Sequence, residues 1–154
     1  MLDYAIRLNK HYSLDIRNND GQTPAMMACK NGAMDCLNLL IENGSDLTSR
    51  DNSQKNSYVA ILMGDQLELL EIFYQDMVRF EKENQEIFGM IHWAAGAQGS
   101  RCLSYLLEKS DLSELLSRTL DKREKASPLH FASIAQNEQN CKILLKHMSS
   151  KQRS

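Results

Sequence analysis

Apolar residues in this chain recur with the spacing of short amphipathic helices, and the helices come in pairs. The first pair is predicted over Pro24–Lys30 and Met34–Glu42, and an Asn-Gly dipeptide ends each helix. Asp20-Gly21 predicts a turn before the pair. Thr23-Pro24 is typical of a helix start, because Thr can cap free N–H groups and Pro fits the first helical position. Isolated helices shorter than ~12–15 residues are marginal in water, so this pair needs further copies to pack against.

The same pattern returns twice at a spacing of 33 residues and once more at 38. In the first three copies all the aligned second-helix positions are apolar, which at this composition has a chance probability on the order of 10⁻⁵. A period near 33 with two helices per copy indicates a stacked repeat array. The aligned residues are Cys36, Leu37, Leu39 and Leu40; Leu69, Leu70, Ile72 and Phe73; Cys102, Leu103, Tyr105 and Leu106; and then Cys141, Ile143 and Leu144.

The later copies predict helices over 57–63 with 66–75, 90–97 with 101–108, and 128–135 with 137–147. The helical pattern of 66–75 continues through Phe80 without a stop glycine, so this helix can run one or two turns longer. The mixed-charge run Glu81–Glu86 then predicts solvated surface, with a docking finger as the alternative. The five extra residues before the last copy fall in Ser110–Ala126. There Asp111–Leu116 predicts an extra helical turn whose leucines Leu112, Leu115 and Leu116 pack against neighbouring second helices.

Three segments resemble ankyrin repeats: Asp20-Gly21-Gln22-Thr23-Pro24, Ile91-His92-Trp93-Ala94-Ala95 and Ser127-Pro128-Leu129-His130-Phe131-Ala132. Asn43-Gly44-Ser45-Asp46-Leu47 is similar to the stretch that leads from a second helix into the next finger. The resemblance covers about Leu14 to Met148 and implies an all-α solenoid of stacked helix pairs with short β-hairpin-like fingers. The second and third copies depart most, with Asn56-Ser57 and Phe88-Gly89 in place of a Thr-Pro start.

We therefore expect one ankyrin-repeat domain over 1–154. An N-terminal helix over Met1–Lys10, within 1–18, is either a cap or the remainder of an earlier repeat. Asn140 replaces an apolar residue in the last repeat, and we expect it to face solvent and end the array. The repeats are predicted over 19–50, 51–83, 84–121 and 122–148, followed by a polar tail over 149–154.

Composition narrows the possible partners and the compartment. The 154 residues carry a net charge of −2, so no basic face indicates nucleic acid. No apolar run approaches the ~18 residues that span a bilayer, and the start of the chain lacks the features of a secretory signal. The four cysteines show no paired spacing, which favours a reducing compartment, cytoplasmic or nuclear. We expect a monomer in the absence of a partner.

The sequence offers little chemistry for catalysis, and we predict no enzyme, no cofactor and no metal. The resemblance implies that His92 and His130 are structural and bond the backbone beside the fingers; a zinc pair is the alternative, without ligands at suitable spacing. Cys29, Cys36, Cys102 and Cys141 all fall on predicted packing faces. Gly96 and Gly99 follow a helix rather than a strand, so they do not form a phosphate loop.

The predicted function is protein–protein interaction through a concave face of fingers and first helices, which lets a long ligand touch every repeat. A regulatory segment of a larger enzyme or channel, packed on its own neighbouring domain, is one alternative, and an enzyme with an unrecognised site is another. Met26, Met27, Met63 and Met90 either fill the core or form an adaptable patch. Trp93 and Phe131 either pack in the core or line the groove. The resemblance assigns partner contacts to Asn19, Gln22, Lys30, Asn31, Arg50, Asn52, Lys55, Met63, Gln85, Glu86, Phe88, Arg123 and Glu124.

Overall fold

The computed structural model describes residues 14–84, 86–117 and 126–152 of the chain. Within these ranges 65% of the residues are helical and none belongs to a strand. The predicted N-terminal helix lies outside the described residues, as do Gln85, Arg123 and Glu124. The helices are α2 (Pro24–Asn31), α3 (Met34–Glu42), α4 (Ser57–Met63), α5 (Leu67–Asn84), α6 (Met90–Ala95), α7 (Arg101–Lys109), α8 (Leu112–Ser117), α9 (Pro128–Ile134) and α10 (Glu138–Gln152).

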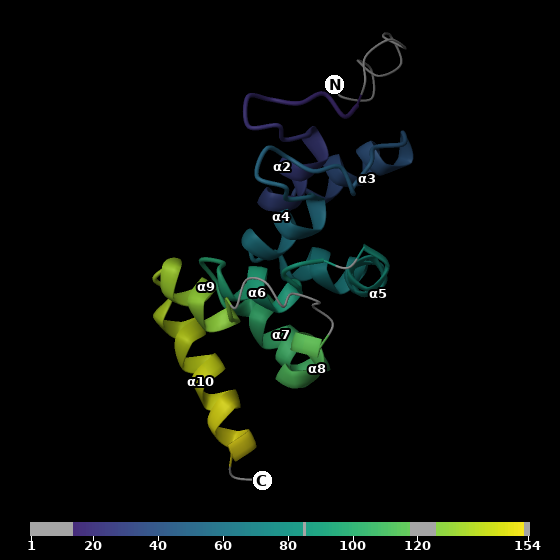
Figure 1. Ribbon diagram of the computed structural model, residues 1–154. Helices are drawn as coiled ribbons and strands as arrows, with labels where there is room; N and C mark the ends of the chain where they lie inside the picture. The colour runs from purple at the N-terminus through teal and green to yellow at the C-terminus, as the bar shows by residue number, and fades with distance from the viewer. Residues whose placement is uncertain (1–13, 85, 118–125, 153–154) are drawn as a thin grey trace.

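The helices form four antiparallel pairs that follow one another along the molecule (Figure 1). In each pair a short first helix contacts its second helix: α2 with α3, α4 with α5, α6 with α7 and α9 with α10. The first helices also contact in sequence order, α2 with α4, α4 with α6 and α6 with α9. Apolar residues from neighbouring pairs therefore share one continuous core, which is the all-α solenoid that the 33-residue period predicts.

The core contains the residues that the repeat alignment places at equivalent positions. Leu37, Leu70 and Leu103 each have 0% exposure. Two other aligned positions do not belong to the core, because Cys36 and Ile72 are exposed. Cys36 therefore does not lie on a packing face. A second helix buries only one stripe, and Ile72 lies beside that stripe. Cys36 is exposed although its equivalents Leu69 and Cys102 are buried.

The second helix of the second pair is much longer than its equivalents. α5 continues from Leu67 to Asn84, which confirms the continued helical pattern and extends beyond it. The charge pattern predicted that its last turns are solvated, but one of the charged side chains there is buried. Glu81 is only 6% exposed, and a carboxylate oxygen of Glu81 accepts a hydrogen bond from the backbone N–H of Met90. A charge run thus contains one carboxylate that caps the next helix.

The five-residue insertion forms α8, as predicted, and packs against α6. Leu112 and Leu115 are buried. Leu116 is 36% exposed, so the prediction that all three leucines pack inward is wrong for this one. A six-residue helix turns less than twice, and Leu115 and Leu116 cannot both point at the same neighbour.

The last pair differs from the prediction at two places. α10 runs to Gln152, so residues 149–152 are helical rather than a polar tail. Asn140 has 0% exposure and does not face solvent. Its amide nitrogen lies 3.1 Å from the carbonyl oxygens of Ala95 and Gly99, in the third pair. Asn140 therefore ties the last pair to the pair before it.

Side chains in the turns between paired helices join neighbouring pairs in the same way. Gln66 donates to the carbonyl of Lys30 at 3.0 Å. Asp65 accepts from the backbone N–H of Cys102 at 2.9 Å and from that of Arg101 at 3.3 Å. Asp65 thus caps α7, whereas Ser100, directly before this helix, makes no capping bond with its side chain.

Candidate partner-binding face

The first two fingers are built on the same turn, 33 residues apart. In the first, the Asn18 carboxamide oxygen accepts from the backbone N–H groups of Asp20 (3.0 Å) and Gln22 (2.9 Å). In the second, the Asp51 carboxylate accepts from the backbone N–H groups of Ser53 (2.8 Å) and Lys55 (2.9 Å). Such side chain–backbone bonds stabilise tight turns without strands.

The two fingers also contact each other. The Asn52 backbone N–H donates to the carbonyl of Asp20 at 3.0 Å, and the Asn52 side chain donates to the carbonyl of Asn19 at 3.0 Å. Gly21 has a φ of 77°, and a β-carbon there would lie 2.4 Å from an Asn52 side-chain oxygen. Glycine is therefore required in the first finger both by its conformation and by the approach of the second. Asn19 and Asn52, predicted as partner contacts, help to hold the fingers together.

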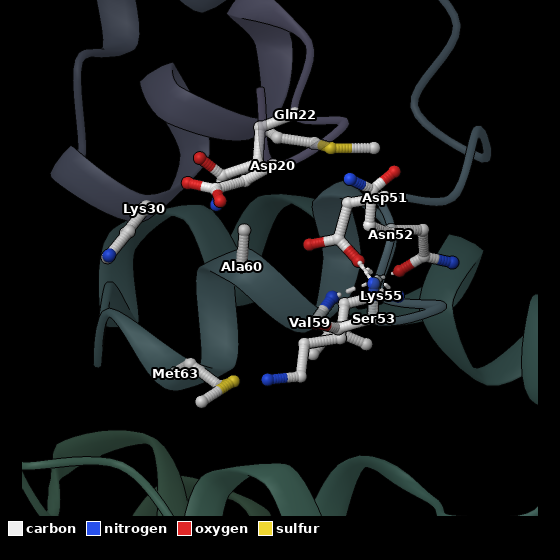
Figure 2. Close-up of a pocket in the computed structure, with 12 residues that line it drawn as sticks. Asp20, Gln22, Lys30, Asp51, Asn52, Ser53, Lys55, Val59, Ala60 and Met63 are labelled. Carbon is white, nitrogen blue, oxygen red and sulfur yellow. Dashed lines mark hydrogen bonds between the residues drawn. The ribbon is translucent and has the colours of Figure 1, made fainter. Parts of the chain in front are cut away.

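A groove of about 240 Å³ lies between these fingers and the first helices α2 and α4. We call the side of the solenoid that holds the fingers and the outward residues of α2, α4, α6 and α9 the finger face. In Figure 2, Asp20 and Gln22 project from the first finger toward the groove, opposite Ala60 and Met63 of α4. Five of the predicted contact residues line the groove: Gln22, Lys30, Asn52, Lys55 and Met63.

Two lysines at this groove carry charges that the described part of the chain does not neutralise. Neither Lys30 nor Lys55 makes an ion pair with a described residue. The ammonium of Lys55 instead lies 5.5 Å from the centre of the Trp93 ring, in a cation–π contact. The carboxylate of Asp51 is held by the amides of its own finger. The groove thus carries two lysine charges that a ligand carboxylate can reach, beside the carboxylates of Asp20 and Asp51, above an apolar floor of α4.

Arg50 and Glu86 were predicted as separate partner contacts, but the structure brings them together. Their side chains form an ion pair between the second finger and the loop before α6. The Arg50 guanidinium also lies 5.9 Å from the centre of the Phe80 ring. A second arginine joins them, because Arg17 donates to the Arg50 carbonyl. These charges position the second finger before any partner arrives.

An aromatic cluster continues the finger face beyond the groove. Phe88, Trp93 and Phe131 are half-buried and meet edge to face, with ring centres 4.9 Å apart for Phe88 and Phe131 and 5.5 Å apart for Trp93 and Phe131. His92 is buried beneath them and touches both phenylalanines. Trp93 and Phe131 thus pack against the core, as one of the two interpretations predicted, and both remain half-exposed.

The two histidines have the backbone role that the resemblance implied. The Nδ1 atom of His92 accepts from the backbone N–H of Gly89 at 3.2 Å, and that of His130 accepts from the backbone N–H of Ser127 at 3.0 Å. Both bonds join the third residue of a first helix to the cap of that helix. Within the described ranges no group of three or more His, Cys, Asp or Glu side chains could hold a metal ion.

The cysteines do not form a reactive site on this face. Burial raises the pKa of the Cys29 thiol to about 12, although a bond to Ser57 lowers it somewhat. Burial also raises the pKa of Cys102, and the nearby Asp65 carboxylate adds to that rise. A thiol with a raised pKa stays protonated and is a poor nucleophile at neutral pH. Cys36 is exposed but lies on α3, away from the groove.

Sequence reasoning missed one prominent residue of the face. Ile134, the last residue of α9, is 82% exposed. It occupies in the last pair the place of Lys30 and Met63 in the first two pairs, but the longer 38-residue spacing hides this equivalence. Counting across the insertion would have found it. Asn31, by contrast, was predicted as a contact but donates to the carbonyl of Met27 in its own helix.

Stacked helix pairs whose fingers and first helices form one face define an α-helical repeat protein. Residues 8–59 match the family model described as ankyrin repeats (many copies), so this part of the chain is similar to ankyrin-repeat proteins. Ankyrin repeats generally mediate protein–protein interaction, and the family is typically non-catalytic.

Inversins from three mammals are similar to this chain over 136 residues. The identity is 24% for the dog and human proteins and 23% for the mouse protein. The alignment covers 88% of this chain but only 12% of each relative. The chain thus corresponds to a small part of the length of these relatives. In the part of the chain that the structure describes, no helix is long and apolar enough to cross a membrane.

Proposed function

We propose that this chain is a non-catalytic binding module that takes another protein, or a peptide segment of one, on its finger face. The observation that carries the proposal is the continuity of this face. The groove beside Met63 leads past Lys55 to the aromatic cluster around Trp93, so a single ligand can contact successive helix pairs. Half-buried aromatic and methionine side chains are suited to such contacts, because much of their area is still available for burial.

Binding fits the groove better than catalysis does. The groove is lined by neither histidine nor cysteine, and its lysines show no pairing with a nucleophile. A catalytic site needs a nucleophile or base within hydrogen-bond reach of a partner group. We therefore propose that Lys30 and Lys55 act as recognition charges. Exposed charges of this kind alter association rates more than they alter affinity.

The length of the relatives favours a second candidate of the same class. A chain that matches 12% of a longer protein can be a regulatory segment that packs on a neighbouring domain of its own polypeptide. The face and the contacts would then be the same, but the ligand would be intramolecular. We further propose the division into repeats over 19–50, 51–83, 84–121 and 122–148, and a cytoplasmic or nuclear location in keeping with four unbonded cysteines.

The test compares two double variants in affinity capture of a natural partner. Lys55→Ala with Phe88→Ala changes the finger face. The control, Glu71→Ala with Ile72→Ala, changes exposed residues of α5 that do not line the groove. We expect the first pair to weaken capture at least tenfold and the control to leave it unchanged, after circular dichroism has shown that both proteins are folded. The opposite pattern would place the binding site on the second helices.

A further inference from the structure

We infer that the ligand of the finger face is an amphipathic α-helix that lies along the stack, with acidic side chains at the end nearest α2. The inference rests on the proposed function and specifies the partner. It concerns an apolar strip that we define as Met63 of α4, Trp93 of α6, and Phe131 and Ile134 of α9.

The strip consists of residues at two repeated places on the first helices. Trp93 and Phe131 occupy one of them, while Met63 and Ile134 occupy the other. In the third pair, Gly96 stands at the second place. A β-carbon at Gly96 would lie 3.5 Å from the Phe131 side chain, so the Phe131 ring fills the space above this glycine. The strip is therefore continuous from α4 to α9. Its far end is the least covered, because Ile134 is 82% exposed.

The spacing of the first helices matches the length of two helical turns. α4 contacts α6, and α6 contacts α9, and the axes of packed helices lie roughly 8–10 Å apart. Seven residues of an α-helix rise about 10 Å. A ligand helix along the stack can thus place one apolar side chain on each of α4, α6 and α9, at positions i, i+7 and i+14, with i+3 or i+4 residues filling the gaps.

An extended ligand fits this strip less well, for a reason of hydrogen bonding. Every residue of an extended segment exposes a backbone N–H and C=O that need partners. The strip offers apolar side chains instead, and the finger amides of Gln22 and Lys55 already donate to Asn18 and Asp51. A helix satisfies its own backbone groups internally. It can therefore cover an apolar strip without leaving polar groups unpaired.

Charge sets the orientation of the helix along the stack. At the first pair, the place of Met63 and Ile134 is taken by Lys30, which makes no ion pair with a described residue. Lys55 lines the same groove, and the partner of its ammonium among the described residues is the Trp93 ring. Two carboxylates also line the groove: that of Asp51 accepts the amides of its own finger, and that of Asp20 is not held in this way. The two lysines favour acidic side chains, or the negative end of a helix dipole, at this end of the ligand.

The experiment selects ligands without assuming a sequence. The purified chain is screened against a displayed library of random 20-residue peptides, and the enriched peptides are synthesised without tryptophan. Trp93 is the only tryptophan of the chain, so its fluorescence reports binding at the strip. We expect enriched peptides with apolar residues at spacings of three, four and seven, acidic residues toward one end, and a gain of helical signal on binding. Proline in the middle of a peptide should weaken binding at least tenfold.

Matched variants locate the bound peptide. Ile134→Asp should weaken peptide binding at least tenfold, whereas Ile72→Asp, at another exposed isoleucine on α5, should change it less than threefold. Enriched peptides with alternating apolar residues that tolerate proline would overturn the helical ligand, yet leave the proposed face intact if Ile134→Asp still weakens them. Three other results would overturn the inference. They are peptides whose binding does not change with Ile134→Asp, a screen in which no peptide is enriched, and a dimer of the free chain that Ile134→Asp abolishes.

Discussion

Single residues at the ends of the first helices decide how closely neighbouring helix pairs approach. Gly64 ends α4 with φ near −81°, a conformation open to any residue. Glycine is needed there for steric reasons, because a β-carbon at Gly64 would lie 2.2 Å from the carbonyl oxygen of Lys30 in the preceding pair. That oxygen belongs to the backbone and already accepts from Gln66. It cannot move without separating the two pairs.

We therefore expect Gly64→Ala to destabilise the fold by about 1–3 kcal/mol, the usual cost of overpacking. Gly96→Ala is the matched control. Gly96 ends α6 with nearly the same φ, but its nearest neighbour would be the Phe131 side chain at an ordinary 3.5 Å. Urea unfolding followed by circular dichroism measures both free energies. Equal stabilities for the two variants would show that the pairs do not approach as closely as the structure indicates.

Thiol chemistry offers a second test at the residue scale. Because burial raises the pKa of Cys29 to about 12 and also raises that of Cys102, both thiols stay protonated well above neutral pH. At pH 8 we expect a disulfide reagent to modify the exposed Cys36 quickly in the native protein, and Cys29 and Cys102 only in denaturant. Because Cys141 is partly exposed, it should still react in the Cys36→Ser variant, and Cys36→Ser with Cys141→Ser should remove the native reaction. Fast native modification of Cys29 would mean that α2 is not packed as described.

At the scale of elements, the connection between α5 and α6 replaces a finger with a helix cap. In the first two fingers Asn18 and Asp51 start a turn, whereas at the equivalent place in the third pair Asn84 is still helical and bonds the Phe80 carbonyl. The short helix α6 then depends on Glu81, whose carboxylate reaches the first N–H of that helix. A negative group is favourable there because of the helix dipole.

We expect Glu81→Ala to cost about 1–3 kcal/mol, since it leaves a buried N–H without its acceptor. Glu83→Ala is the control, because Glu83 lies in the same turn of α5 but is exposed. Hydrogen exchange should also show earlier opening of Met90–Ala95 in the Glu81 variant. A Glu81 variant as stable as the Glu83 variant would mean that the charge run is solvated, as its sequence alone suggested.

Asn140 links the third and fourth pairs through the Ala95 and Gly99 carbonyls. Its replacement by Ala should cost about 1–3 kcal/mol, because the buried acceptors lose their donor. Gln139→Ala, at an exposed neighbouring position of α10, should be close to neutral. Thermal unfolding distinguishes the two. If both were neutral, Asn140 would be a solvent-facing end of the array rather than a link within it.

For the molecule as a whole, stability comes from similar contacts repeated along one axis. Leu37, Leu70 and Leu103 are all fully buried at equivalent places in successive pairs. Each replacement by Ala removes comparable buried area and leaves a comparable cavity, so each should cost ~2–5 kcal/mol. Ile72→Ala, at a 58% exposed position, should cost little. Denaturant unfolding would contradict this equivalence if one of the three leucine variants were nearly as stable as the unmodified chain.

The sequence by itself determined the helix pairs, their order and most of the core. These features depend on local periodicity, and each pair packs on the next in the same way, so a 33-residue spacing is enough to identify Leu37, Leu70 and Leu103 as equivalent. The resemblance to ankyrin repeats also pointed to five residues that line the groove.

Only the tertiary structure decided the contacts of residues that do not follow the 33-residue spacing. Glu81, Asn140 and the Arg50–Glu86 pair find their partners in another helix pair or in a neighbouring loop, and no periodic pattern states which side chain meets which backbone group. Ile134 belongs to the finger face only because the insertion folds aside as α8 and lets α9 continue the stack on α6. The regular spacing of the sequence specified the stack, and contacts between residues outside that spacing specified its surface.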